Sequence, residues 1–368
     1  MNIDLLDKNL TISRYPKTSN KSLQAWNASD ELMLEYVEKL DVKSKSIAIY
    51  NDRFGFLGCF LSEFKPFVII DYKSQQKACR LNLEANNLSI PEDQFLSPLA
   101  PLPQKIDIAF IKIPKSLDLF RLYLYQVSQN LSDEAVVVCG FMTKYFSPQM
   151  LSIAEEFFED VEQSLAKKKS RILILKKKKS AKEISIINTI SLGDAETGQK
   201  SIQQYFGVFS ANNIDFATQY LMDQLQVKEN EHRVLDLACG NGVLAYAVQA
   251  NYPNREVHVQ DDSILAIESA KLNLDGRLTH FHYDDTLDEF EDEYFDLVVS
   301  NPPFHFEYET NIEISLGLFH QVKRCLKPDG RFLCVANQHL NYKTHLEKIF
   351  PAVKTVAENN KFVIYEAS

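Results

Sequence analysis

The sequence is poor in cysteine, tryptophan and long apolar runs. Its 368 residues include six cysteines and one tryptophan, and no two cysteines form a CxxC pair. We therefore expect neither a disulfide framework nor a metal site, and we expect the reduced thiols of a cytoplasmic protein. Apolar runs such as 67–70 and 172–175 are far shorter than the roughly 20 residues that span a bilayer. The acidic N-terminus also lacks the pattern of a signal peptide, so no membrane partner is expected.

Charge is distributed unevenly along the chain. Residues 1–200 carry a net charge of +2, whereas residues 201–368 carry −12, and all eight histidines follow residue 231. Apolar residues make up 45% and charged residues 24%, which is the balance of a globular protein. The length suggests two domains, and the charge asymmetry indicates that they do different jobs.

The second half of the chain repeats the element pattern of the first. Four blocks recur at nearly constant spacing: 46–58 and 233–245, 71–84 and 261–275, 106–115 and 295–304, and 125–140 and 320–336. A duplication explains this match better than the general pattern of α/β domains. Apolar strands alternate with amphipathic helices in both copies, which indicates parallel strands covered on both faces.

The fold class that we predict is therefore α/β, with two tandem Rossmann-like modules. The polar stretch 182–200 reads as a linker, and a boundary near Gly193 gives modules at residues 1–193 and 194–368. Only a short loop precedes the last apolar strand, 361–367, so we expect that strand to be antiparallel.

A glycine turn follows the first apolar strand of the second copy. In the segment VLDLACGNG, Gly240 and Gly242 lie where the strand turns into a helix. Glycine lets the backbone approach a ligand, and the N-terminus of a helix offers free N–H groups. The same pattern fits a GxGxxA dinucleotide turn with an acid about 20 residues later. A tight turn without any ligand is the remaining interpretation.

Acidic residues around this turn favour S-adenosylmethionine over a nicotinamide. Asp236 lies inside the strand, where its carboxylate can meet the ammonium group of a methionine or order the turn. Asp284 and Asp285 can accept a hydrogen bond from an adenine amine, unless they belong to a solvated acidic loop. The cofactor-binding residues predicted here are Asp236, Ala238, Gly240, Asn241, Gly242, Asp261, Asp262, Asp284 and Asp285.

The segment SNPPFH, residues 300–305, carries the predicted chemistry. An exocyclic amine conjugated to a ring is a poor nucleophile, so catalysis needs acceptors that hold its N–H groups and aim its nitrogen. The Asn301 side-chain oxygen and the Pro302 carbonyl supply acceptors, Pro303 stiffens the backbone with Pro302, and Phe304 stacks on the base. These four residues are the predicted catalytic residues, and His305 either contacts substrate or packs. A simple Asn-Pro-Pro turn is the alternative.

The motifs DLACGNG, QDDS, SNPPFH, VANQHLNY and NNKFV together resemble the bacterial 23S rRNA guanine-N2 methyltransferases of the G type. That family is close to the C-type guanine-N2 methyltransferases of the small subunit. The resemblance covers nearly the whole chain and implies two class I methyltransferase modules, of which only the second is active. It also implies S-adenosylmethionine as cofactor, 23S rRNA as partner, and a cofactor pocket that includes Phe209 and Ser210, with Asn301 counted in that pocket as well.

The first copy has lost the residues that carry this chemistry. Ile49, Arg53 and Lys112 stand where the second copy has the strand acid, the first turn glycine and the amide. We therefore expect the degenerate first module to bind no cofactor and to recognise RNA. Basic residues around the strand 172–175 neutralise phosphates in this interpretation, or they line a solvated edge strand. The predicted RNA-binding residues are Lys167, Lys168, Lys169, Arg171, Lys176, Lys177, Lys178 and Lys179.

These patterns predict a monomeric, S-adenosylmethionine-dependent methyltransferase of N2 of a specific guanine in 23S rRNA. A 16S rRNA guanine-N2 methyltransferase is the nearest alternative, ahead of a protein-glutamine or DNA-adenine methyltransferase. A non-catalytic RNA-binding factor in ribosome assembly is the alternative from another class. The intact DLACGNG and NPPF motifs argue against that last alternative.

Overall fold

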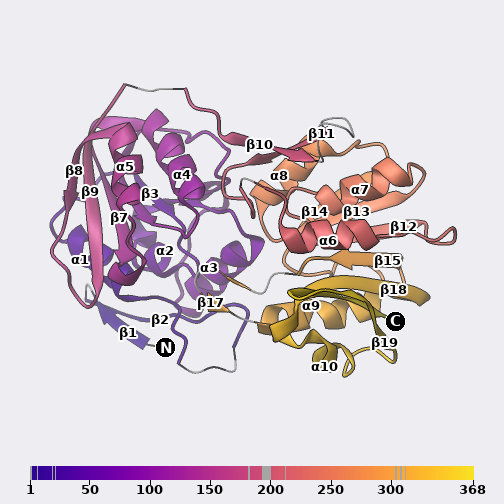
Figure 1. Cartoon of the computed structure of the whole chain (residues 1–368). Helices are drawn as coiled ribbons and strands as arrows, with labels where there is room; N and C mark the ends of the chain where they lie inside the picture. Colours follow the sequence, from indigo (N-terminus) through magenta and orange to yellow (C-terminus); the bar gives the residue numbers. More distant parts are fainter. Residues whose placement is uncertain are drawn as a thin grey trace. The chain divides into compact units, whose positions relative to one another are not determined.

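The chain divides into two compact units, Met1–Ile186 and Ile187–Ser368, in the computed structural model (Figure 1). The structure describes residues 2–5, 7–18, 20, 22–180, 183–192, 200–211, 213–302, 305–306, 309–310 and 312–368, without the side chains of Asn2 and of 305–313. Gly193 lies outside the described residues. Part of the stretch expected to be a linker forms β10 (Ile187–Leu192), which pairs with β11 (Lys200–Tyr205) as an antiparallel hairpin.

The first unit is built on a seven-stranded sheet with the order β5-β4-β3-β6-β7-β9-β8. The strands from β5 to β7 are parallel, whereas β9 and β8 run antiparallel to their neighbours. Its helices and strands are β1 (Asn2–Leu5), β2 (Lys8–Thr11), α1 (Ala28–Val37), β3 (Ile47–Tyr50), α2 (Phe56–Phe60), β4 (Phe67–Ile69), α3 (Lys73–Ala85), β5 (Phe95–Leu96), β6 (Ile106–Lys112), α4 (Leu117–Gln129), β7 (Leu131–Met142), α5 (Pro148–Phe157), β8 (Phe158–Gln163) and β9 (Ser170–Lys178).

The second unit is built on a sheet of the same topology, with the order β14-β13-β12-β15-β18-β20-β19. The strands from β14 to β18 are parallel, and β20 and β19 are antiparallel. After β10 and β11, its elements are α6 (Phe216–Gln224), β12 (Arg233–Leu237), α7 (Val243–Asn251), β13 (Glu256–Asp261), α8 (Ile264–Asn273), β14 (Thr279–Tyr283), β15 (Phe295–Ser300), β16 (His305–Phe306), β17 (Glu309–Thr310), α9 (Ile312–Cys325), β18 (Leu326–Asn337), α10 (Tyr342–Leu346), β19 (Val353–Glu358) and β20 (Phe362–Ala367).

Two copies of one strand order confirm the predicted fold class of tandem α/β modules. The predicted antiparallel last strand is also confirmed, because β20 pairs antiparallel with both β18 and β19. In each sheet the strand order reverses beside the first parallel strand, β3 or β12. Ligands of doubly wound sheets bind in the crevice at the carboxyl end of such a strand. The glycine turn follows β12 at this position.

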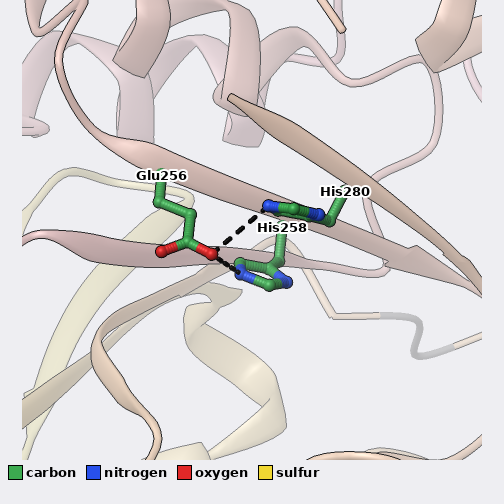
Figure 2. A group of neighbouring side chains, drawn as sticks. All are labelled: Glu256, His258 and His280. Atoms are coloured by element: carbon green, nitrogen blue, oxygen red, sulfur yellow. Dashed lines mark hydrogen bonds and ion pairs between the residues drawn. The ribbon is translucent and has the colours of Figure 1, made fainter. Parts of the chain in front are cut away.

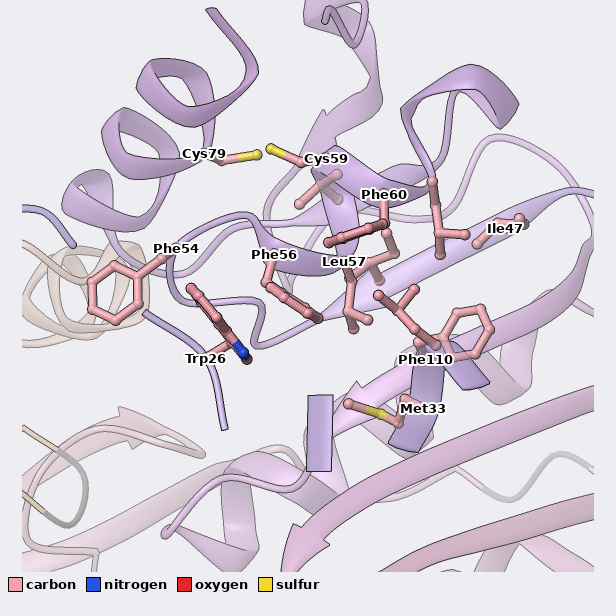
Figure 3. Packing of buried hydrophobic residues seen from close by; sticks show 14 of the residues in the cluster. Trp26, Met33, Ile47, Phe54, Phe56, Leu57, Cys59, Phe60, Cys79 and Phe110 are labelled. Atoms are coloured by element: carbon pink, nitrogen blue, oxygen red, sulfur yellow. The ribbon is translucent and has the colours of Figure 1, made fainter. Parts of the chain in front are cut away.

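Apolar residues cover both faces of each sheet. In the first unit, α1 packs on β7 and β9 and contacts α2. The Trp26 and Phe56 rings stack with centroids 5.4 Å apart, and Phe60 and Met33 belong to the same cluster (Figure 3). In the second unit, α6, α7 and α8 cover one face of the sheet and α9 and α10 cover the other (Figure 1). Across the described ranges, no helix combines the length and apolarity needed to cross a membrane.

Candidate active site

The glycine turn of the second unit places its two glycines in different environments. Gly240 has a φ of 54° and Gly242 a φ of 76°, in the left-handed region that side chains other than glycine rarely adopt. A Cβ on Gly242 would lie 3.0 Å from the Ala270 Cβ, so this glycine allows α7 to pack closely on α8. A Cβ on Gly240 would meet no described atom within 4 Å. The turn therefore packs at Gly242 and leaves space for a ligand at Gly240.

Asp236 lies beneath the turn and is fully buried. Its Oδ2 accepts a hydrogen bond from the Ala245 N–H at 3.0 Å, which ties β12 to the first turn of α7. Its Oδ1 has no hydrogen-bond partner among the described residues. Burial raises the pKa of this carboxyl to about 8. The sequence leaves two roles open for Asp236, and its hydrogen bond with the Ala245 N–H supports the ordering of the turn.

Acidic residues stand at the carboxyl ends of β13 and β14, beside the turn. Asp261 accepts hydrogen bonds from the Gly240 N–H at 2.9 Å and the Ser263 N–H at 2.8 Å, and burial raises its pKa to about 6. The Asp284 side chain accepts from the Thr286 N–H at 3.0 Å. The neighbouring Asp262 and Asp285 are half-buried, as Asp284 is. The two strands are adjacent and parallel, so these carboxylates gather at one edge of the sheet.

Gln204 on β11 is a residue of this site that the sequence analysis missed. Its fully buried side chain accepts a hydrogen bond from the Asn241 Nδ2 at 2.7 Å. It donates to the carbonyls of Val208 at 3.2 Å and Ser210 at 3.4 Å. Gln204 therefore links the segment 207–210 to the glycine turn, which supports a shared pocket. Phe209 of that segment is 67% exposed and is available for a contact.

Asn301 follows β15 and is held by two residues at the start of α6. Its Nδ2 donates to the Asp215 Oδ2 at 3.1 Å and to the Thr218 Oγ1 at 2.9 Å. A carboxylate only accepts hydrogen bonds, so the amide nitrogen must face Asp215 and the Asn301 Oδ1 must face away from it. Asp215 also caps α6 by accepting from the Ala217 N–H at 3.0 Å. The amide oxygen is thereby left to accept from another molecule.

The rest of the NPPF motif is described only in part. Pro302 is buried next to Asn301. Pro303 and Phe304 lie outside the described residues, and His305 belongs to the short strand β16. Sequence reasoning did not find Asp215 or Thr218, because they lie 86 and 83 residues before Asn301. An N-cap aspartate was the only local signal for Asp215.

The basic residues of the first unit form two groups at opposite ends of β9. Residues 167–169 precede the nine-residue strand and 176–179 lie at its end, so roughly 23 Å of extended chain separates the Cα atoms of Lys169 and Lys176. The strand β9 lies between β7 and β8, so the alternative interpretation of these lysines as lining an edge strand is wrong. Only the group 167–169 lies at the carboxyl end of β7, because Met142 pairs with Ser170.

Most of these lysines already contact the first unit itself. Lys167 and Lys168 form ion pairs with Glu35 at 2.5 Å and Glu31 at 2.8 Å. Lys177 pairs with Asp160 at 3.0 Å. The Nζ atoms of the next two lysines donate to backbone carbonyls, Lys178 to Leu131 and Lys179 to Glu155. Arg171 is half-buried, whereas Lys169 is exposed and Lys176 is partly exposed. An RNA phosphate would have to compete with carboxylates for several of these cations.

The first unit keeps the backbone of the glycine turn with different side chains. Asn51 and Gly55 have φ values of 56° and 74°, close to those of Ala238 and Gly242, at 56° and 76°. Arg53 replaces the glycine at the open position, and its guanidinium lies 5.3 Å from the centroid of the Tyr72 ring. Arg53 is 9% exposed. A long side chain therefore extends from the position that leaves open space in the second unit.

Comparisons with known proteins agree with this geometry. Residues 1–181 match the model of the RLMG N-terminal domain, and residues 199–366 match that of the methyltransferase small domain. This chain is similar in fold to a structure of the T. thermophilus 16S rRNA N2 G1207 methyltransferase (RsmC) in complex with AdoMet and guanosine. The TM-score is 0.77 at 19% sequence identity, and the match covers 100% of this chain and 97% of that chain.

Proteins named ribosomal RNA large subunit methyltransferase G are similar in sequence over the full length. The one from Psychromonas ingrahamii is 31% identical over 99% of this chain and 98% of its own. The one from Vibrio vulnificus is 30% identical over 100% of this chain and 99% of its own. The one from Shewanella loihica is 33% identical over 98% of this chain and 93% of its own. The glycine turn and the oriented Asn301 amide are consistent with these relatives. The sequence identity over the full length shows that the chain belongs to the ribosomal RNA large subunit methyltransferase G family.

Proposed function

We propose that this protein transfers a methyl group from S-adenosylmethionine to the exocyclic N2 amine of a specific guanine in 23S rRNA. The observation that carries the proposal is the orientation of the Asn301 amide by Asp215 and Thr218. Membership of the family supports the reaction, and the names of the relatives support large-subunit rRNA as the substrate.

The second unit has the features that an S-adenosylmethionine site needs. The space at Gly240 admits a ligand close to the backbone, and the unpartnered Asp236 Oδ1 lies beneath the turn. Carboxylates at the ends of β13 and β14 suit ribose hydroxyls and an adenine amine. The bound cofactor supplies an electrophilic methyl group on a sulfonium centre. The residues proposed to hold it are Phe209, Ser210, Asp236, Ala238, Gly240, Asn241, Gly242, Asp261, Asp262, Asp284, Asp285 and Asn301.

The Asn301 Oδ1 and the Pro302 carbonyl accept the two N–H groups of the guanine amine. Holding both N–H groups aims the nitrogen lone pair at the methyl carbon, in a geometry close to that of the transition state. When bound, S-adenosylmethionine would supply the methyl carbon for the new C–N bond, and its sulfur would keep the electrons of the C–S bond that breaks. The surplus proton on nitrogen then leaves to water. Pro303 stiffens this segment and Phe304 stacks on the base in the same proposal.

We also propose a division of labour between the modules. The first module binds RNA and the second carries out methyl transfer, as the net charges of +2 and −12 favour. Arg53 and the replacement of the Asn301 amide by Lys112 support a first module that binds no cofactor. We expect a monomer in the cytoplasm, where rRNA is modified and the six buried free thiols stay reduced.

Mapping methylated guanines in rRNA from cells with and without this gene tests the proposed function. We expect one N2-methylguanine of 23S rRNA to disappear on deletion and to return with the wild-type gene but not with Asn301→Ala. Loss of a 16S rRNA methylation would assign the chain to the small subunit instead. An unchanged rRNA pattern with a defect in subunit assembly would favour the non-catalytic alternative.

A further inference from the structure

Three histidines and two glutamates gather on one face of β13 and β14, on the opposite side of the sheet from α7 and α8. Glu256 and His258 alternate with buried valines along β13, and His280 lies directly opposite His258 on β14. His282 and Glu289 extend the group. Figure 2 shows the Glu256 carboxylate facing the rings of both His258 and His280. The methyl-transfer chemistry proposed above uses none of these five residues.

Two kinds of contact occur in this cluster. The His282 Nδ1 lies 2.8 Å from the Glu289 Oε1, as expected for a charge-assisted hydrogen bond. The Glu256 Oε1 lies 3.2 Å from the His258 Nε2 and 3.3 Å from the His280 Nε2, longer than such bonds. Zinc bonds of about 2.0–2.1 Å to a tetrahedral centre place ligand atoms roughly 3.3–3.4 Å apart. The two longer distances therefore match the spacing of ligands around one ion.

The number of N–H protons available in the cluster also indicates a cation between Glu256 and His258. Three contacts connect Glu256 to His258, His258 to His282, and His282 to Glu289. Each contact joins two atoms that accept hydrogen bonds unless a proton lies between them. A neutral imidazole carries one N–H, so two neutral rings supply protons for only two of the three contacts. If the contacts of His282 with His258 and with Glu289 are hydrogen bonds, the His258 Nε2 lone pair faces the Glu256 carboxylate. A cation between these two atoms removes their repulsion.

From these contacts we propose that Glu256, His258 and His280 form a binding site for one divalent transition-metal ion of the Zn²⁺ class, which joins β13 to β14. Two imidazoles and a carboxylate with a water in the fourth position are a common ligand set for zinc. The three ligand atoms already lie within 4.8 Å of one another.

Neighbouring groups hold two of these ligands in place. Arg233 donates to the second carboxylate oxygen of Glu256 at 3.2 Å, which leaves Oε1 for the metal. His258 donates from Nδ1 to His282, at 3.0 Å, and His282 donates to Glu289, the relay that commonly orients metal-bound histidines. The rings of His258 and His280 are 24° from parallel, so His280 must turn to share an ion. Its side chain is 51% exposed and can do so.

Zinc titration of the chelator-treated full-length protein, in competition with a chromophoric zinc indicator, tests this proposal. We expect one Zn²⁺ per chain. His280→Ala should weaken that binding at least about tenfold, and Glu289→Gln by about 10–100-fold through the relay. His339→Ala is the matched control, because His339 is an exposed histidine outside the cluster. Zn²⁺ should also raise the melting temperature of the wild type and of His339→Ala, but not of His280→Ala.

Cobalt in place of zinc separates this site from the buried thiols, because a histidine–carboxylate site gives visible d–d bands without a thiolate charge-transfer band. Absence of stoichiometric Zn²⁺ binding would overturn the proposal and leave a shared proton between Glu256 and His258. Equal affinities for His280→Ala and His339→Ala, or a thiolate band with cobalt, would also overturn it. The readouts are independent of methyl transfer, so they hold whether or not the proposed function is right.

Discussion

Weakening the acceptors that orient Asn301 should reduce the rate of methyl transfer more than the affinity for the cofactor. The Asp215 Oδ2 accepts from both the Ala217 N–H and the Asn301 Nδ2. Asp215→Asn keeps the cap of α6, because asparagine is as good an N-cap as aspartate, and its amide oxygen can take the place of Oδ2, but the negative charge is lost. Hydrogen bonds to charged groups contribute about 1.5–3 kcal/mol, and neutral ones about 0.5–1.5 kcal/mol. Replacing the charged acceptor by a neutral one costs the difference, about 1–1.5 kcal/mol, so Asp215→Asn should slow the chemical step about 5–13-fold. Thr218→Val removes the hydrogen bond to Thr218 and should slow the step about 2–13-fold.

Single-turnover methylation of 23S rRNA with labelled S-adenosylmethionine measures these effects, and calorimetry measures cofactor affinity. Asn301→Ala should lose roughly 10²–10³-fold in rate, comparable to the removal of one preorganised polar group. Thr218→Ser keeps the hydroxyl and is the control for Thr218→Val. In the Asn301→Ala background, Asp215→Asn should cause no further loss, since the residue that it orients is gone.

Two results would refute this reasoning. If Asp215→Asn methylates at the wild-type rate, the orientation of the Asn301 amide does not depend on the charge of Asp215. If the loss appears in cofactor affinity, with an unchanged rate at saturation, then Asp215 and Asn301 serve the cofactor and not the guanine amine. Equal melting temperatures for Asp215→Asn and wild type would show that the cap of α6 survives the substitution.

Three further predictions concern the turn, its buried acid and the basic groups. Gly242→Ala should lower the melting temperature more than Gly240→Ala, because only a Cβ on Gly242 would crowd Ala270. Calorimetry should instead find the larger loss of cofactor affinity in Gly240→Ala. Equal melting temperatures for the two variants would contradict the assignment of packing to Gly242. The Asp236 carboxyl of the folded protein keeps its proton up to a pKa of about 8, so its contribution to stability falls as pH rises from about 4 to about 8. In denaturant unfolding, Asp236→Asn should therefore stabilise the protein more at pH 8 than at pH 5. An equal effect at both pH values would show that Asp236 ionises with an ordinary pKa. Replacing 176–179 or 167–169 by glutamine should flatten the salt dependence of RNA affinity by about 0.7–0.9 for each phosphate that the variant no longer neutralises, without changing cofactor affinity; unchanged slopes would show that neither group binds RNA.

The fold and the position of the site followed from sequence because both depend on local patterns. Alternating apolar strands and helices predicted the doubled sheet, and the turn glycines and the NPPF motif lay at strand ends, where ligands of such sheets bind. The contacts that orient the site are not local. Gln204 and Asp215 act on residues 37 and 86 positions away, so only the folded chain brings them together.

The basic groups and the histidines show what a sequence pattern leaves out, namely where the strands place its residues. Lysines on both sides of one short strand read as a single patch, yet an extended strand places its ends far apart. Metal sites were excluded because no cysteine pair was found. Glu256, His258 and His280 come together only because β13 and β14 are adjacent and in register, and the separate strand sequences do not contain that information.

Under the proposed mechanism, the first module keeps the fold around the position that matches Asn301 but lacks the acceptor that the second module uses. In the second module, Asp215 holds Asn301. Asp215 lies at the start of α6, the helix before the first parallel strand. In the first module, Asp30 at the start of α1 holds Lys112 at the matching position, at 2.7 Å. The acid and its interaction are kept, but an ammonium group has three donors and no acceptor, so it cannot receive the N–H of a substrate amine. The same interaction that orients an amide for catalysis thus serves in the first module as a buried ion pair, which gives a structural reason for an inactive site to keep its geometry.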